Sequence, residues 1–529
     1  MDYPLVIGQM LTTGLAAAPA QRITYGDQVD MTYAEFGQRV SRLGSALSRL
    51  GLGQGAVVAV MDYDSHRYLE CFFAIPMLGA TLHTVNVRLS PEQVLYTINH
   101  AEDDAILVHA DYLALLLPLL PRMRPVKLIL LADRPVPLPD GFAGAYEDLL
   151  AEGDPAFSFP EFPETTRATL FYTTGTTGDP KGVTYTHRQL VLHSLGVIAC
   201  FAPIPGRGGI KQDDVYMPLT PLFHVHGWGF PLVATMLGMR QVYPGRYEPV
   251  KLLHLIAEHG VTFSHCVPTI LAMILGAPES EAVNLSNWKV IIGGSALSEG
   301  LARLAMARGI DVHTGYGLSE TCPILTVADM AATRTAAGDT TAIRTATGKA
   351  APLVQIRVVD PDMRDVPHDG LATGEVVARA PWLTHGYLRN DAGTEALWRG
   401  GWLHTGDVGN MAADGTLRIT DRLKDVIKSG GEWISSLELE SIISAVPGVV
   451  EVAAVGMPDP QWGERPVVLV VSRSDVEAAA HAAVAAAIAS GRLSKWAAPK
   501  QVMTVDAIPK TSVGKIDKKA IRARLGQTG

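Results

Sequence analysis

The sequence predicts an α/β fold divided into more than one domain. With 529 residues the chain is too long for a single hydrophobic core. Over residues 57–110, and again over 214–292, short apolar runs alternate with helical stretches, which is typical of a mostly parallel sheet covered by helices. After residue 346 short antiparallel strands and turns are expected instead. The prediction is a large N-terminal domain of mixed α/β subdomains with a β-rich subdomain, followed by a small α+β domain.

Individual elements follow from these patterns. Strands are expected at the apolar or alternating runs 57–61, 105–108, 288–292, 354–358, 374–379, 450–455 and 466–471. Helices are expected at 68–78, 436–446 and 475–490. The segment 332–347 is rich in alanine and threonine and is expected to form a surface loop.

Composition excludes several functional classes. A net charge of −9 argues against general nucleic-acid binding, and 18% charged residues suit a globular enzyme. No secretory signal is visible, and the most apolar run, 113–120, is too short to span a bilayer. A cytoplasmic location is therefore expected, with peripheral membrane contact left open. Four widely spaced cysteines are expected as buried thiols: Cys71, Cys200, Cys266 and Cys322.

A run of threonines and glycines at 173–178, followed by Pro180 and Lys181, predicts a phosphate-binding segment. Its N–H groups and hydroxyls can turn toward one anion while the lysine adds a positive charge. The spacing differs from the common nucleotide-triphosphate loop, because Pro180 stands where a second glycine would be needed. A polar surface hairpin is the alternative.

Three weaker motifs point to a nucleotide. Tyr316 lies between glycines, where it can stack on a purine, and Glu320 can ligate Mg²⁺. Asp407 ends a turn and can accept hydrogen bonds from ribose hydroxyls. Lys515 lies on a short glycine-containing loop near the C-terminus and can reach a distant site. Taken singly, the Tyr316 cluster is better explained as a glycine-rich turn with an exposed acid, Asp407 can be a solvated turn acid, and a basic tail such as that of Lys515 is more often solvated surface.

The order of the motifs between Tyr172 and Lys515 is more specific than any one of them. The series is Thr-Thr-Gly-Thr-Thr-Gly-x-Pro-Lys-Gly, Tyr-Gly-x-Ser-Glu-Thr, Thr-Gly-Asp, Asp-Arg-x-Lys-Asp and Pro-Lys-Thr-x-x-Gly-Lys. It resembles the signature series of the ANL adenylate-forming superfamily. Within that superfamily, segments 220–228 and 428–436 look most like those of bacterial medium- and long-chain fatty acyl-CoA synthetases.

This resemblance implies a two-step reaction that uses ATP, Mg²⁺ and coenzyme A. A carboxylic acid first forms an acyl-adenylate and pyrophosphate, and the thiol of CoA then takes the acyl group and releases AMP. The resemblance implies a large adenylation domain at 1–422 and a small, mobile domain at 423–529. Related fatty-acid enzymes are often dimers, so a homodimer is also expected.

The resemblance implies binding and catalytic roles for individual residues. The implied ATP-binding residues are Thr173, Thr174, Gly175, Thr176, Thr177, Gly178, Lys181, Gly294, Ser295, Thr314, Gly315, Tyr316, Gly317, Ser319, Asp407, Arg422 and Lys428. The implied Mg²⁺ ligands are Thr176 and Glu320. The implied acyl pocket contains His224, Trp228, Val267 and Pro268. The implied CoA-binding residues are Gly430, Gly431 and Trp433. The implied catalytic residues are Lys515 and His224, with Lys424 as the hinge.

The sequence is also compatible with other substrates and acceptors. The acid can be an aryl, cyclic or thioether acid, and the acceptor can be an amine or a carrier protein in place of CoA. A catalytically silent binding protein fits poorly, because every implied catalytic position is filled.

Overall fold

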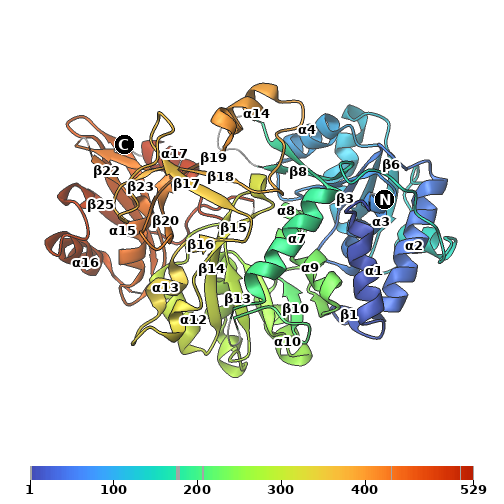
Figure 1. Ribbon diagram of the computed structural model, residues 1–529, viewed down its shortest axis with the longest axis horizontal. Coiled ribbons are helices and arrows are strands. Elements are labelled where there is room, and N and C mark those ends of the chain that lie inside the picture. Colours follow the sequence, from blue (N-terminus) through green and yellow to red (C-terminus); the bar gives the residue numbers. More distant parts are fainter. Residues whose placement is uncertain are drawn as a thin grey trace.

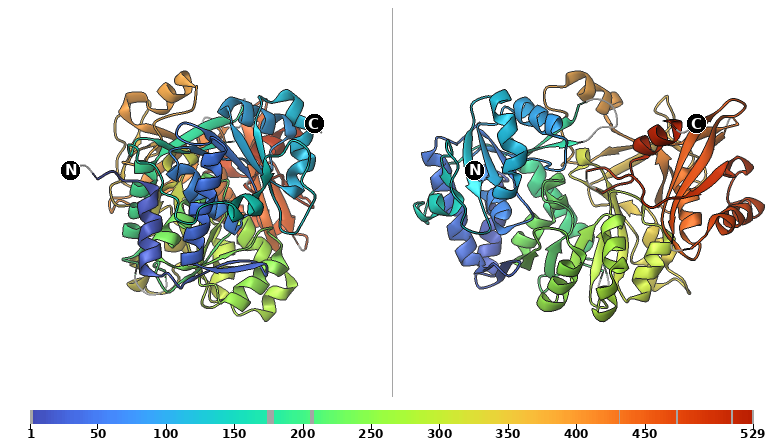
Figure 2. Two further views of the ribbon diagram at one scale, coloured as in Figure 1. Left: turned by 90° about the vertical axis from the view of Figure 1, so that its right-hand side faces the viewer. Right: turned by 180° about the vertical axis from the view of Figure 1, so that it is seen from behind.

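The computed structural model describes residues 3–173, 179–204, 208–430, 432–472, 474–512 and 514–527. Its elements form four sheets with covering helices (Figure 1). The N-terminal and C-terminal parts of the chain lie at opposite ends of the long axis, and the middle of the chain lies between them. The view from behind shows the same arrangement (Figure 2).

The first sheet has seven strands in the order β7-β6-β5-β3-β4-β8-β9. Their bounds are β3 Val57–Met61, β4 Thr81–Thr84, β5 Ala105–His109, β6 Lys127–Leu131, β7 Gly144–Ala145, β8 Arg167–Thr173 and β9 Lys181–Thr186. All neighbours are parallel except β8 and β9, which form an antiparallel hairpin. Strand β3 is buried along its whole length, as expected for a parallel strand covered on both faces.

The second sheet has nine strands in the order β16-β15-β14-β13-β12-β10-β11-β1-β2. Their bounds are β1 Arg22–Tyr25, β2 Val29–Thr32, β10 Val215–Pro218, β11 Arg240–Tyr243, β12 Phe263–Cys266, β13 Lys289–Ile292, β14 Asp311–Gly317, β15 Ile324–Val327 and β16 Lys349–Ala350. Its central strands, from β1 to β14, are parallel. Their carboxyl ends therefore meet at one edge, where sites in such sheets usually form.

Two smaller sheets complete the chain. The antiparallel sheet of the β-rich subdomain contains β17 Gln355–Val359, β18 Gly374–Arg379, β19 Leu403–Met411 and β20 Leu417–Arg422. The sheet of the small C-terminal domain contains β21 Ile427–Ser429, β22 Glu432–Ile434, β23 Val449–Asp459, β24 Gly463–Ser472 and β25 Gln501–Thr504. The predicted class, a large α/β domain with a smaller C-terminal domain, is confirmed.

Helices of the large domain are α1 Ile7–Ala17, α2 Tyr33–Arg49, α3 His66–Met77, α4 Pro91–Ala101, α5 Leu113–Leu116, α6 Tyr146–Ala151, α7 His187–Phe201, α8 Val225–Trp228, α9 Phe230–Leu237, α10 Pro249–His259, α11 Pro268–Gly276, α12 Glu299–Ala307, α13 Thr341–Thr345 and α14 Asp391–Leu397. The small domain adds α15 Ser436–Ser444, α16 Glu477–Ala489 and α17 Lys518–Gln527. Local sequence fixes several starts: Thr32 and Glu35 form a capping box at α2. Among the described helices, none combines the length and apolarity needed to cross a bilayer.

The expectations for one loop and for one cysteine are wrong. The expected loop at 332–347 contains the short helix α13, and Cys200 is only partly buried although it was expected in the core. The other three cysteines are buried as predicted. The predicted strands are confirmed within a few residues at each end.

Candidate active site

A pocket lies at the carboxyl ends of β13 and β14, beside α8. It is lined by His224, Val225, Trp228, Ile291, Gly293, Gly294, Gly315, Tyr316, Gly317, Leu318, Ser319, Pro323, Ile324 and Lys515. Eight of these were predicted from the sequence: His224, Trp228, Gly294, Gly315, Tyr316, Gly317, Ser319 and Lys515. The remaining six adjoin the motifs, so extending each motif by a few residues could have found most of them. Only about 30 Å³ of the pocket is free.

Lys515 reaches this pocket from a hairpin near the C-terminus. Its N–H donates to the Thr511 hydroxyl at 3.2 Å, and its carbonyl oxygen accepts from the Thr511 N–H at 2.7 Å. The side chain lies against Gly294, which has a φ of +77°. A Cβ atom at Gly294 would lie 3.0 Å from Lys515 Cε. Glycine is therefore needed at this position, both for its backbone conformation and for the approach of the lysine.

A buried carboxylate lies beside the aromatic wall of the pocket. Asp407 pairs in register with Arg422 across β19 and β20, so the residue expected on a turn lies within a strand. Its carboxylate accepts a hydrogen bond from the Tyr316 hydroxyl at 2.8 Å and lies 3.2 Å from Arg422 Nε. Burial raises the pKa of Asp407, and the nearby Arg422 cation opposes that rise. The pair fixes an acceptor next to the tyrosine ring.

A second carboxylate lies next to the β8–β9 hairpin. The Tyr387 hydroxyl donates to Glu320 Oε1 at 2.7 Å, and Lys181 Nζ lies 4.7 Å from the centre of the Tyr387 ring. Thr173 pairs with Lys181 in the hairpin register. Tyr387 thus brings together an acid and a lysine that are far apart in sequence, and no motif marks it. Five predicted phosphate-binding residues lie outside the described residues: Thr174, Gly175, Thr176, Thr177 and Gly178.

The segment carrying the predicted acyl-pocket residues has an unusual backbone. Residues 225–229 all have positive φ angles, a conformation that is uncommon outside glycine. This turn places Trp228 so that a Cβ atom at Gly293 would lie 3.0 Å from its ring. The Trp228 ring centre is 5.2 Å from that of His265. Burial, aided by the Lys515 charge, lowers the pKa of His224 to about 3, so its imidazole is neutral near pH 7.

Two family models match this chain and identify its family. The model described as AMP-binding enzyme matches residues 13–388, and that of the AMP-binding enzyme C-terminal domain matches residues 438–515. The chain belongs to the AMP-binding enzyme family. The adenylate-forming superfamily predicted from the motif series is thereby confirmed.

Several curated relatives and solved structures resemble this AMP-binding enzyme over nearly its whole length. A long-chain-fatty-acid–CoA ligase of Thermus thermophilus is 38% identical, covering 95% of this chain and 91% of the relative. A 3-methylmercaptopropionyl-CoA ligase of Ruegeria lacuscaerulensis is 35% identical, covering 99% and 97%. A crystal structure of the anthranilate CoA ligase AuaEII with anthranoyl-AMP superposes with a TM-score of 0.89, covering 100% and 99% at 22% identity. That last likeness confirms the fold.

Other predicted residues of the AMP-binding enzyme lie around the pocket without lining it. Val267 Cγ1 lies 3.0 Å from the Cβ position at Gly294, and Pro268 begins α11. Ser295 is exposed beside Gly294. The Thr314 hydroxyl contacts the backbone carbonyl groups of Arg344 in α13 and of Ala346, which indicates a structural contact at this residue.

The predicted CoA-binding residues lie on the small domain. Lys428 Nζ is 5.5 Å from the centre of the Trp433 ring, and that tryptophan is 58% exposed. Gly430 is exposed, and a Cβ atom there would lie 2.8 Å from the Trp496 ring. Gly431 lies outside the described residues. Lys428 was expected in the ATP site, but neither it nor Gly430 nor Trp433 lines the pocket that the described residues form.

The predicted hinge, Lys424, lies in the turn between β20 and β21. The Leu423 N–H donates to the Gly406 carbonyl at 3.0 Å, and Asp425 pairs with Arg522 at 2.7 Å. The turn is thus attached to the β-rich sheet on one side and to α17 of the small domain on the other.

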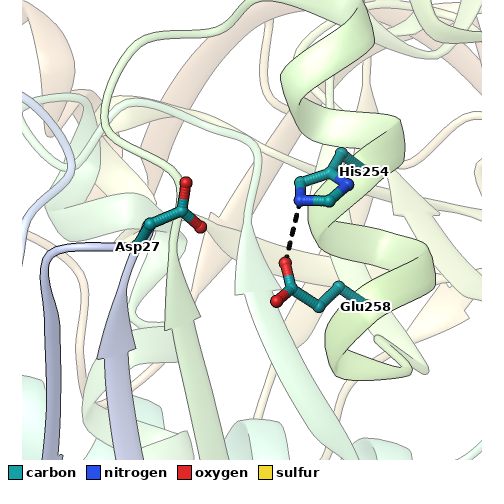
Figure 3. A group of neighbouring side chains, drawn as sticks. All are labelled: Asp27, His254 and Glu258. Atoms are coloured by element: carbon teal, nitrogen blue, oxygen red, sulfur yellow. Dashed lines mark ion pairs between the residues drawn. The ribbon is translucent and has the colours of Figure 1, made fainter.

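Three potential metal ligands gather elsewhere on the surface: Asp27, His254 and Glu258 (Figure 3). His254 and Glu258 are four residues apart on α10 and form an ion pair at 2.9 Å. All three side chains are exposed, as such charged groups commonly are. This group plays no part in the pocket described above.

Proposed function

We propose that this AMP-binding enzyme is an ATP-dependent acyl-CoA synthetase that adenylates a fatty or related carboxylic acid and transfers the acyl group to CoA. The observation that carries the proposal is the position of Lys515: a lysine from the chain's last residues lies in one pocket with Tyr316, Ser319 and His224. The names of the two curated relatives, both CoA ligases, support CoA as the acceptor.

In the proposed first step, two anions must approach each other. Lys515 would lie between the attacking carboxylate and the α-phosphate, where a cation stabilises the negative charge of the transition state. Asp407 would accept hydrogen bonds from the ribose, and the Tyr316 ring would lie against the adenine. Neutral His224 adds no further positive charge to the acyl side of the pocket.

A magnesium ion fits the residues near Lys181. Among the described residues, one oxygen of Glu320 accepts from Tyr387, which leaves the other oxygen for a cation. Carboxylate oxygens are ligands that Mg²⁺ prefers. When bound, the ion would supply charge neutralisation on phosphate oxygens. Tyr387 would hold the Glu320 carboxylate in place, and Lys181 would bind phosphate directly. Thr176 is the second proposed ligand.

The second step would require a different arrangement of the two domains. In this arrangement Lys515 lines the pocket, whereas the proposed CoA-binding residues Gly430 and Trp433 do not. Rotation of residues 423–529 about Lys424 would withdraw the lysine and bring Gly430, Gly431 and Trp433 to the pocket. One pocket would then serve both steps.

Two classes of acid fit the pocket. Apart from Lys515 and His224, its lining carries no charged or titratable side chain except the Tyr316 phenol, which favours an apolar acyl group. Trp228 fills much of the space, so a long chain needs this ring to move, whereas a short thioether acid needs less room. The names of the two relatives correspond to these two classes. A homodimer, a cytoplasmic location and peripheral membrane contact stay predictions from the sequence.

A panel of acids tests the proposal. The purified enzyme is incubated with ATP, Mg²⁺ and fatty acids of increasing length, aryl acids or thioether acids, with and without CoA. We expect AMP, pyrophosphate and acyl-CoA in equal amounts with an apolar acid. Pyrophosphate formation that continues to a stable amide or carrier-bound product, with no acyl-CoA, would replace CoA by another acceptor. ATP binding without pyrophosphate formation on any acid would contradict the proposal.

Adenylation should depend on pH through Lys515. Burial, together with the Arg422 charge, lowers the pKa of Lys515 from 10.5 to about 8. The ammonium is therefore present below pH 8 and lost above it, so kcat/KM for ATP in acyl-adenylate formation should fall as the pH rises through 8. A pH profile of the first half-reaction checks this. A profile that stays flat from pH 7 to pH 10 would exclude a protonated lysine as the essential group.

A further inference from the structure

The lysine hairpin, described at residues 510–512 and 514–516, contacts segments that follow strands of both parallel sheets of the large domain. Asn86 follows β4 of the seven-stranded sheet, and its Nδ2 donates to Ser512 Oγ at 3.0 Å. Thr269 lies in α11, just after β12 of the nine-stranded sheet, and its hydroxyl donates to the Gly514 carbonyl at 2.8 Å. These two bonds reach the hairpin three residues and one residue before Lys515. They join parts of the chain separated by 426 and 245 residues.

The amide of Asn86 is oriented by its own turn. Its Oδ1 accepts from the Arg88 N–H at 3.1 Å, which leaves the NH₂ group to face Ser512. The side chain is almost fully buried, at 7% exposure. Two residues earlier, at the end of β4, the Thr84 hydroxyl donates to the Phe223 carbonyl at 3.0 Å, next to His224 of the pocket. The end of β4 is therefore connected both to the segment that carries His224 and Trp228 and to the lysine hairpin.

The hairpin is closed by its own hydrogen bonds. The Gly514 N–H donates to the Thr511 carbonyl at 2.9 Å, in addition to the two bonds between Thr511 and Lys515. Lys510 pairs with Ile516 and forms an ion pair with Glu451 of the small domain at 2.9 Å. Anchors at Ser512 and Gly514 thus determine where the Lys515 side chain leaves the backbone.

We propose that Asn86 and Thr269 are positioning residues for Lys515. They hold the lysine hairpin between the two sheets during adenylation and release it when the small domain rotates. The inference rests on the proposed role of Lys515 in the first step. Neither residue lines the pocket, so both act through the hairpin. Small displacements of a reacting group reduce rates strongly, which is why two ordinary hydrogen bonds can matter here.

The first test compares Thr269→Val with Thr269→Ser. Valine has nearly the shape of threonine but cannot donate, whereas serine keeps the hydroxyl. We expect Thr269→Val to lower kcat for acyl-adenylate formation about threefold to tenfold, the usual effect of losing one hydrogen bond. Transfer from a synthetic acyl-adenylate to CoA should stay unchanged, as should the thermal unfolding midpoint. Thr269→Ser should restore the adenylation rate.

A double-mutant cycle tests the other anchor. Asn86→Ala and Ser512→Ala remove the two partners of one bond, so each should slow adenylation, and the double variant should be no slower than the worse single variant. Each measurement again includes transfer from the preformed adenylate. Because Ser512 belongs to the hairpin and Asn86 to the large domain, coupling between them can arise only when the hairpin is docked.

Several outcomes would overturn the inference. Equal loss of both half-reactions in Thr269→Val, or loss that Thr269→Ser does not restore, would indicate a general structural role. Full adenylation by Thr269→Val together with additive effects in the cycle would show that the contacts do not position the lysine. If Lys515→Ala does not affect adenylation selectively, the proposed role of Lys515 is wrong, whatever the anchor variants show. The two failures are therefore distinguishable.

Discussion

Replacing Lys515 with alanine should reduce acyl-adenylate formation by about a thousandfold, the order seen when a transition-state charge stabiliser is removed. The reason is the position of its ammonium group, which is brought into the pocket beside Gly294 and faces no fixed carboxylate partner at hydrogen-bond distance among the described residues. The cation is thus available to the reacting anions. Pyrophosphate release with acid, ATP and Mg²⁺ measures the effect.

The matched control for this variant is Lys510→Ala. Lys510 lies on the same hairpin but forms an ion pair with Glu451 and does not line the pocket. It should retain adenylation within about threefold, since partly exposed ion pairs contribute little. If both alanine variants lost pyrophosphate release to the same extent, the hairpin as a whole, and not the Lys515 charge, would be responsible.

Replacing Lys424 with proline should leave acyl-adenylate formation nearly unchanged and slow the transfer of the acyl group to CoA. Proline fixes φ near −65° and restricts the residue before it, so the turn can no longer take up different backbone angles. The described arrangement already has Lys515 in the pocket, so adenylation should proceed at a rate within about threefold of wild type. Transfer of the acyl group to CoA should fall about a hundredfold, because rotation becomes limiting.

Transfer from a synthetic acyl-adenylate to CoA measures the Lys424→Pro effect directly. Lys424→Ala serves as the control, since it removes the same charge and side chain while leaving the backbone free to rotate. It should retain most of the transfer rate. Unchanged transfer in the proline variant would show that this turn is not the hinge.

Much of the fold could be predicted because local patterns determine it. The alternation of apolar strands with amphipathic helices gives the parallel sheets, and runs such as 57–61 are buried on both faces. The helix α13 could not be predicted, because its short sequence has no apolar period. A tertiary contact holds it instead: Arg344 pairs with Asp311 at 2.6 Å.

The residues of the candidate site also divide into those that the sequence predicts and those that it does not. Residues within glycine-rich or charged motifs, such as Tyr316 and Lys515, could be identified because the motifs themselves are distinctive. Tyr387 and Asn86 could not, because each acts through contacts with distant residues and lies in no motif. Thr269 adjoins the predicted residues Val267 and Pro268, but its contact with Gly514 could not be foreseen. Tyr387, for example, reaches Glu320 across 67 residues. Such partners become visible only when the fold brings the chain together.

In the proposed mechanism, one pocket performs two steps because Lys515 enters it for the first step and leaves it before the second. The most direct measurement is the ratio of the two half-reaction rates, pyrophosphate release and acyl transfer from synthetic adenylate, in Lys515→Ala and Lys424→Pro side by side. We predict that the ratio falls by about a thousandfold in the first variant and rises by about a hundredfold in the second. Ratios that move in the same direction, or that stay at the wild-type value in both variants, would contradict it.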